Sequence, residues 1–294
     1  HFCDNILILV QVSPLTLTLI KQGTVIYLGT LSGVYTAVKK DGTTYYRSSF
    51  TYKNKHISLG SYNTEAEAGK AYMEACRLIA SDAGITDYKP GQNSLLFAKW
   101  VSIINFRDNG IYIRTPIYLQ NRMFRYYYDI HDYYIFDVDD LFYYSEHTIT
   151  RRGGHMFVNE YGMQVNIMSR YGIQNHAVCG RDYIHVNGDN RDFRYSNIHI
   201  INRYNGVRMG ISENVTTYTA IIHLNGDFII GRFDDELTAA VAYNKAADYI
   251  NTLGIQINYS KNYIEELDSG QYMELYKGIR LSKNLMNSCK NMVN

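Results

Sequence analysis

The feature of this sequence that most constrains its fold is an internal repeat of about fifty residues. One copy spans residues 33–80 and the other spans residues 206–253. Each copy opens on Gly-Val, continues through strand-like segments and ends in an alanine-rich segment that follows an acidic turn. Because a repeat of this length is one supersecondary unit, we expect the same small module to occur twice.

Turn and capping signals divide each copy into strands followed by a helix. Asp41-Gly42 and Asn225-Gly226 are dipeptides that supply a positive φ in tight hairpin turns. Thr64 and Glu67 have the spacing of a capping box, which starts a helix in the first copy. We therefore predict an α+β fold in which each copy is a three-stranded antiparallel sheet with one helix across one face.

The order of residues in both copies resembles the APETALA/ethylene-response-factor DNA-binding domain. The likeness rests on Gly-Val, then Leu/Ile-Gly-x-Phe/Tyr, then an acidic helix start and Ala-Ala/Gly-x-Ala-Tyr. It covers about fifty residues in each copy. In that family the three-stranded sheet lies in the major groove and the helix backs it, so the resemblance implies double-stranded DNA as the partner.

The predicted DNA contacts of the first copy lie on the sheet face away from the helix. Side chains alternate along a strand, so Ser48 and Phe50 share the helix side. The opposite face carries Arg47, Ser49, Thr51, His56 and Ser58, and the strand ends and turns carry Lys39, Lys40, Lys53 and Lys55. Arg47 has the fork that reads guanine, and the lysines neutralise phosphates.

The two copies differ in charge. Residues 33–82 contain seven basic and five acidic residues, whereas residues 206–254 contain three basic and six acidic ones. We expect the open face of the second sheet to be apolar, with Thr219, Ile221, His223 and Ile229. The second copy is therefore the module predicted to make a homodimer or interdomain contact, and its assignment to DNA depends on the resemblance alone.

Between the two copies, residues 184–198 read IHVNGDNRDFRYSNI. This segment resembles the core of the HNH endonucleases, and residues 136–141 and 166–170 are similar to parts upstream of that core. An HNH core followed by an APETALA-type domain is an arrangement of homing endonucleases. The resemblance covers residues 136–205 and implies a β-rich ββα domain, a divalent ion such as Mg²⁺ and a histidine general base.

Three positions of the HNH pattern lack the expected residue. His185 matches the base and Asn197 the final metal ligand, but Ile184 replaces the metal-binding Asp and Phe193 the middle Asn. Ser169 replaces the upstream His. Mg²⁺ requires octahedral oxygen coordination, so one ligand holds it poorly. We expect His185 to be vestigial, no cofactor to be used, and Asn197 to bind metal only if the chain is an active nuclease.

The middle of the chain uses arginine as its basic residue. No lysine occurs between Trp100 and Asn244. The arginines predicted to hold the DNA backbone are Arg151, Arg152, Arg170 and Arg194. Tyrosine clusters at 126–128, 133–134 and 143–144 have the pattern of base-stacking side chains, but we favour their assignment to the core and to cross-strand pairs.

Composition bears on the compartment. The net charge of +1 gives no global basic field, and the four cysteines form no Cys-x-x-Cys pair, which argues against zinc and a disulfide framework. The apolar stretch 6–20 is interrupted by Gln11, Ser13 and Pro14 and is too short to span a membrane. We expect a cytoplasmic, nucleoid-associated protein of bacterial or mobile-element origin with no membrane contact.

The expected organisation has five parts. They are an N-terminal segment without an assigned module (1–30), the first APETALA-like module (31–90), the degenerate HNH-like domain (95–205), the second module (206–260) and a helical tail (261–294), with a linker at residues 89–93. The leading hypothesis is a sequence-specific, regulatory DNA-binding protein derived from a homing endonuclease that has lost cleavage activity. The alternatives are an active metal-dependent HNH endonuclease and a non-enzymatic scaffold.

Overall fold

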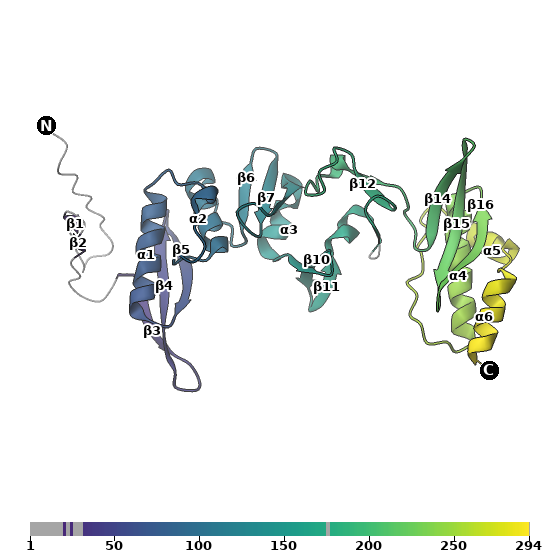
Figure 1. The fold of residues 1–294 in the computed structure, drawn as a ribbon, viewed down its shortest axis with the longest axis horizontal. Helices are drawn as coiled ribbons and strands as arrows, with labels where there is room; N and C mark the ends of the chain where they lie inside the picture. The colour runs from purple at the N-terminus through teal and green to yellow at the C-terminus, as the bar shows by residue number, and fades with distance from the viewer. Residues whose placement is uncertain (1–19, 22–23, 26–31, 175–176, 294) are drawn as a thin grey trace. The chain divides into compact units, whose positions relative to one another are not determined.

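The computed structural model describes residues 20–21, 24–25, 32–174 and 177–293, and the described part is a mixed α+β fold with six α-helices (Figure 1). The chain divides into two compact units, residues 1–148 and 149–294. Most of the expected N-terminal segment, including its apolar stretch up to residue 19, lies outside the described residues. A short hairpin there pairs β1 (Ile20–Lys21) with β2 (Thr24–Val25). Among the described helices, none combines the length and apolarity needed to cross a bilayer.

The first module is a three-stranded antiparallel sheet with a helix on one face. Its elements are β3 (Val34–Val38), β4 (Thr44–Tyr52), β5 (Lys55–Tyr62) and α1 (Glu65–Ile79), with strand order β3-β4-β5 (Figure 1). The capping box is present, because the Glu67 N–H donates to Thr64 Oγ1 and the Thr64 N–H donates to the Glu67 carboxylate, each at 3.2 Å. Ala68, Ala71 and Ala75 are fully buried, so the helix backbone lies close to the sheet.

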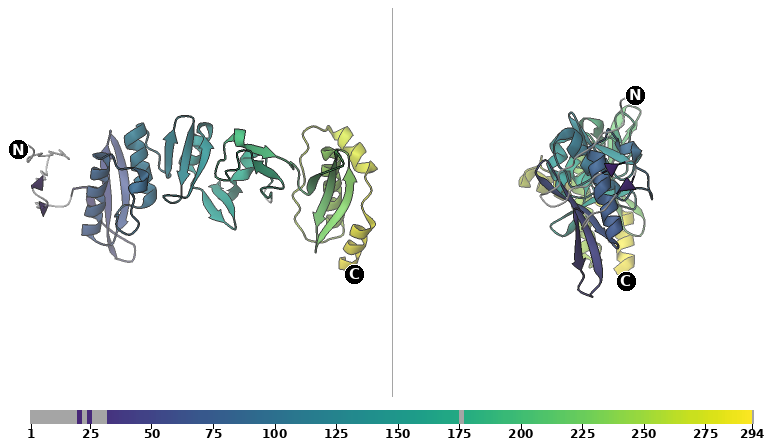
Figure 2. Two further views of the ribbon diagram at one scale, coloured as in Figure 1. Left: turned by 45° about the horizontal axis from the view of Figure 1, so that its top comes forward. Right: turned by 90° about the vertical axis from the view of Figure 1, so that its left-hand side faces the viewer.

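The second module repeats this arrangement. Its elements are β14 (Val207–Ser212), β15 (Val215–His223), β16 (Asp227–Phe233) and α4 (Glu236–Thr252), with strand order β14-β15-β16 (Figure 2). Asp235 caps α4 by accepting the Thr238 N–H at 2.7 Å. Here too the alanines of the helix are buried against the sheet.

One glycine in each module fixes the distance between sheet and helix. Gly33 has φ +76, and a Cβ there would lie 2.3 Å from the Tyr72 ring and 2.4 Å from the Ser49 carbonyl oxygen. Gly206 has φ +68, and its Cβ would meet the Tyr243 ring at 2.2 Å and the Ile221 carbonyl oxygen at 2.3 Å. The carbonyl of each glycine accepts the N–H of the same middle-strand residue. Only glycine fits both the space and the backbone conformation.

The third strand of each sheet carries a β-bulge at the same place. In the first module Leu59 has no partner in β4, because Ser48 pairs with Gly60 and Ser49 with Ser58. In the second module the corresponding extra residue lies between Ile229 and Gly231. Bulges increase the local strand twist, so the two sheets share their curvature as well as their topology.

The hairpin turns match the predicted dipeptides only in part. Gly42 has φ +85, as expected for Asp41-Gly42. The prediction for Asn225-Gly226 is wrong, because neither residue has a positive φ and the turn is closed by the Leu224 N–H donating to the Gly226 carbonyl. Of the two hairpin turns in the second module, the β14–β15 turn is the one with positive φ values, at Glu213 and Asn214.

A further helix extends the first module. Helix α2 (Phe97–Asn109) packs Trp100, Ile103 and Ile104 into the core formed by α1 and the sheet. Glu74 on α1 accepts the N–H groups of Ser94 at 2.7 Å and Leu95 at 2.8 Å. The segment predicted as a linker therefore leads into a helix held against the first module.

The C-terminal tail extends the second module in the same way. It contains α5 (Ser269–Gly278) and α6 (Lys283–Val293), and its Ile264, Ile279 and Leu285 are buried in the core beneath α4. Lys245 Nζ donates to the carbonyl oxygens of Tyr276 and Ile279 at the end of α5. Glu74 of α1 lies beside the N-terminus of α2, and Lys245 of α4 lies beside the C-terminus of α5. The charge of each side chain is opposite to the partial charge of the helix end that it contacts.

Three small sheets follow the first module and precede the second in the sequence. The first, in the N-terminal unit, consists of β6 (Ile117–Gln120), β7 (Met123–Tyr127) and β8 (Tyr133–Asp137), followed by α3 (Leu141–Glu146). Tyr126, Tyr127 and Tyr144 are buried, and Tyr127 packs against Tyr133 across the strands at 5.3 Å between ring centroids. These contacts confirm the assignment of the tyrosine clusters to the core and to cross-strand pairs.

The second small sheet and the HNH-like hairpin lie in the C-terminal unit. Their strands are β9 (Thr150–Arg152), β10 (His155–Glu160) and β11 (Met163–Asn166), then β12 (Tyr183–His185) paired with β13 (Ile198–Ile200). In the described residues between β9 and β14 the helical turns are of the 3₁₀ type, at 167–171 and 195–197. The α-helix expected to complete a ββα motif is therefore not found there.

Replacing Gly33 with Ala tests the role of the close approach. The added Cβ would overlap the Tyr72 ring and the Ser49 carbonyl, so we expect the free energy of unfolding to fall by about 2–5 kcal/mol. Gly42→Ala is the matched control, because Gly42 also has a positive φ but open space around it, and it should cost only about 1–2 kcal/mol. Urea unfolding measures both, and equal losses would contradict the steric account.

Candidate nucleic-acid interface

The face of the first sheet that α1 leaves uncovered presents a group of polar side chains. The predicted residues that it exposes are Arg47, Thr51, His56 and Ser58. Thr51 lies opposite His56 in the β4–β5 register, and Arg47 lies between Tyr35 on β3 and Ser61 on β5. Tyr35 is exposed and was not predicted from the sequence. It pairs with Arg47 across the strands, so its side chain lies on the same open face.

Three predicted contacts of the first module do not present their side chains on this face. Ser49 has the expected parity, but it is buried at 7% exposure among its neighbours on the middle strand. Lys53 and Lys55 extend toward the helix side, where their ammonium groups lie 5.2 Å from the Tyr52 ring centroid and 5.6 Å from that of Tyr112, respectively. These cation–π contacts favour that side because the rings attract the ammonium charge.

The remaining lysines of the first module lie in the β3–β4 turn. Lys39 and Lys40 are exposed, and the Lys39 backbone closes the turn through bonds with Thr43 and Gly42. Asp41, which follows Lys40, accepts the Thr43 N–H at 2.9 Å, which helps to hold the pKa of Asp41 below its usual range. The basic end of this hairpin therefore includes one carboxylate.

The open face of the second sheet is more basic than predicted. Arg208 on β14 and Arg232 on β16 both lie opposite Thr219 on the middle strand, so the three side chains form a row across the sheet. The prediction that this face is apolar is wrong. It was based on residues of the middle strand and on Ile229, and it left out Arg208 and Arg232 on the two outer strands. Pairing the strands of the repeat one by one identifies both arginines.

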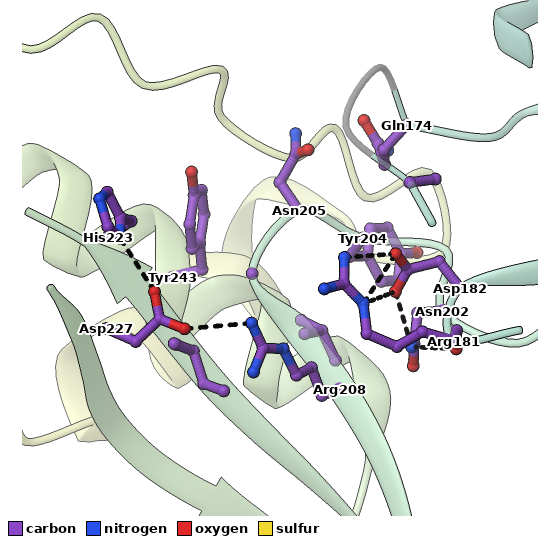
Figure 3. A pocket seen from close by; sticks show the side chains of 14 residues that line it. Gln174, Arg181, Asp182, Asn202, Tyr204, Asn205, Arg208, His223, Asp227 and Tyr243 are labelled. Carbon is purple, nitrogen blue, oxygen red and sulfur yellow. Dashed lines mark hydrogen bonds and ion pairs between the residues drawn. The ribbon is translucent and has the colours of Figure 1, made fainter. Parts of the chain in front are cut away.

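An ion-pair group lies at the other end of this face. The Asp227 carboxylate accepts bonds from His223 Nδ1 at 2.9 Å and from Arg208 at 3.2 Å (Figure 3). The bond from His223, together with that from Arg208, holds the pKa of Asp227 below its usual range. A cavity of about 290 Å³ opens beside the group, and its far wall carries Arg181 and Asp182 (Figure 3). The side chains here are thus already engaged with one another.

The two residues that match the HNH pattern have structural partners in the β12–β13 hairpin. His185 is buried, and its Nδ1 lies 3.0 Å from the Asp192 carbonyl oxygen, which can only accept a hydrogen bond. Asn197 donates its amide to the same carbonyl and accepts the Asn187 N–H, each at 2.8 Å. The Phe193 ring packs edge-on against His185 at 5.1 Å.

These residues do not fit the metal that the HNH resemblance implies. Both amide atoms of Asn197 are used within the hairpin, and Ile184 offers no ligand atom where the pattern has Asp. In the ranges that the structure describes, no group of three His, Cys, Asp or Glu side chains lies close enough to hold an ion. No step of a metal-dependent reaction can be derived from this hairpin.

Asp192 is the centre of the hairpin loop, and sequence reasoning gave it no role. Its carboxylate accepts a bidentate pair from Arg194, at 2.9 and 2.6 Å, and the Asn187 amide at 2.9 Å. Burial alone would raise the pKa of Asp192, but the bonds from Arg194 outweigh burial and hold it below its usual range. The predicted DNA contact Arg194 thus has its fork on Asp192 in this structure.

The other predicted arginines lie along one stretch of the C-terminal unit. Arg151 and Arg152 are exposed on the edge strand β9, and Arg152 lies over the Phe157 ring at 5.9 Å. Arg170 is half-buried in the 3₁₀ turn that follows β11. Of the four, the two on β9 have the exposure that a phosphate contact requires.

Replacing Asp192 with Asn tests its structural role. The Asp192 side chain is 2% exposed, so loss of its charge should lower the free energy of unfolding at pH 7 by about 1–3 kcal/mol. Because the folded-state pKa is depressed, this stabilisation exists above the unfolded value, about 3.9, and is lost as the pH falls through the folded value. Thermal unfolding should therefore show the two proteins converging below about pH 4.

Asp189→Asn is the control for that comparison. Asp189 also pairs with an arginine, Arg191, but its side chain is 34% exposed. Solvent screens such a pair, so the loss should be at most about 1 kcal/mol. Equal losses in the two variants, or a difference that does not depend on pH, would show that Asp192 does not organise the loop.

Comparisons with known families, with curated proteins and with solved structures found no match to this chain. The resemblances noted in the sequence therefore stay predictions.

Proposed function

We propose that this chain binds double-stranded DNA through the open faces of its two sheet–helix modules. We further propose that both modules are APETALA-like and that the β12–β13 hairpin derives from an HNH homing endonuclease without cleavage activity. Sequence-specific, regulatory binding is the role that fits these parts. A narrow antiparallel sheet is one of the shapes that the major groove admits.

One observation carries this proposal. In each module the helix covers one face of the sheet, while the other face carries arginine at its centre or flanks: Arg47 in the first module, and Arg232 with Arg208, which is bonded to Asp227, in the second. An arginine on such a sheet can place its fork on a guanine edge or a phosphate. The surrounding Thr and Ser side chains add short hydrogen-bonding groups that suit a groove.

The hairpin supports a binding role better than a catalytic one. Its His185 and Asn197 are engaged with the Asp192 backbone and with Asn187, and its Arg194 is paired with Asp192. Such a loop is rigid because its polar groups bond to one another. In this proposal the hairpin is retained for its fold, and the exposed Arg151 and Arg152 are the residues of this region that contact backbone phosphates.

Replacing Arg47 with Ala tests the interface of the first module. We expect the variant to lose about 1–3 kcal/mol of binding free energy on selected DNA and to relax its preference at one base pair. The control is Arg77→Ala, an exposed arginine on α1 that faces away from the sheet, and it should bind as the wild type does. Selection from a random duplex pool supplies the DNA, and a loss in Arg77→Ala equal to that in Arg47→Ala would contradict the proposal.

A plasmid-nicking assay tests the loss of cleavage. We expect no nicking with Mg²⁺ or Mn²⁺ beyond that of His185→Ala, because the hairpin offers one potential ligand whose amide is already bonded. Metal-dependent nicking that disappears in His185→Ala would establish the active HNH endonuclease instead.

A further inference from the structure

The three-stranded sheet β9–β11 has one buried and one exposed face. Met156, Val158 and Val165 point into the interior. On the other face, Arg152 lies opposite His155 and Asn159 lies opposite Gln164. These four side chains are exposed. All residues of these three strands are described, and none of those on this face is acidic. The face is therefore a neutral-to-basic surface with two exposed amides.

The amides and the arginine on this face match the edges of nucleic-acid bases. Asn and Gln can bond adenine through two contacts, and Arg can bond guanine or a phosphate. Arg152 lies over the Phe157 ring, which fixes its direction along the sheet. A two-stranded ribbon such as β10–β11 has the width that a DNA groove admits.

The tip of the β10–β11 hairpin carries an unusual residue. Glu160 pairs with Met163, so the turn consists of Tyr161 and Gly162, with φ values of +48 and +81. Such a two-residue turn needs positive φ at both positions and is normally Asn-Gly, because bulky L-residues are disfavoured there. The other non-glycine residues with positive φ in the described ranges are Asn, Lys or Glu.

The unfavourable backbone holds Tyr161 away from the protein. Its side chain is 95% exposed, and Met163 beside it is exposed as well. A tyrosine that packs against nothing gains no burial energy to offset the cost of its conformation. Contact between the Tyr161 ring and another molecule would offset the cost of its backbone conformation.

We propose that Tyr161 is a wedge that inserts between stacked base pairs while the β9–β11 face lies in the groove. The inference rests on the proposed function, because it assumes that the partner is duplex DNA. Proteins that bend DNA place large apolar side chains between base steps in this way, and the bend brings more protein surface onto the duplex. Met163 would extend the apolar tip, and Arg152 would contact the adjoining backbone.

Fluorescence of 2-aminopurine within duplex DNA tests the wedge, because this base brightens when it is unstacked. The full-length chain is mixed with end-labelled random-sequence duplexes that carry the probe, and anisotropy on the same samples measures affinity. Wild type and Tyr161→Phe should raise the emission. Tyr161→Asn should remove the rise and bind at least about fivefold more weakly, since stacking contributes that much per base.

Controls separate the wedge from folding and from the proposed function. Tyr161→Asn restores the preferred Asn-Gly turn, so its melting temperature should rise while its DNA binding weakens. Tyr263→Asn removes a second tyrosine of similar exposure, 86%, and should leave emission and affinity unchanged. Full emission and affinity in Tyr161→Asn would overturn the wedge and leave DNA binding intact, whereas no binding by wild type would overturn both.

Discussion

The close approach of a helix to a sheet, set by a glycine against a tyrosine, is the constraint on which both modules depend. Gly33 lies between the Tyr72 ring and the Ser49 carbonyl, and Gly206 lies between the Tyr243 ring and the Ile221 carbonyl. No side chain larger than hydrogen fits either gap. With alanines along the helix, this contact brings the helix close to one face of a narrow sheet and leaves the other face uncovered.

Because the frame is the same, the side chains on the open faces distinguish the two modules. The first carries one central arginine beside Tyr35, and the second carries two outer arginines around Thr219. The second copy has three basic and six acidic residues over 206–254. Most of its carboxylates lie elsewhere, and Asp227, which does lie on the open face, is bonded to Arg208 and His223.

The sequence predicted the three strands and the helix of each module and the capping box of the first, because these follow from local periodicity and short-range hydrogen bonds, but it did not predict α2. It did not predict that Lys53 and Lys55 turn toward the helix side, since the rings of Phe106 and Tyr112 beside them come from far along the chain. The role of Asp192 was also missed, because it arises from a loop that folds back on itself. Neither long-range ring contacts nor an irregular local loop leaves a periodic signal.

The salt dependence of binding to a random-sequence duplex tests the central claim most directly. Fluorescence anisotropy of a labelled duplex, titrated with the full chain at increasing salt, gives the slope of log K against log salt concentration. If the open faces and β9 meet phosphates, each such contact should contribute a slope of about −0.9. Salt-sensitive binding with a slope of several such contacts is the predicted result, and no retention of the duplex at low salt would contradict the account.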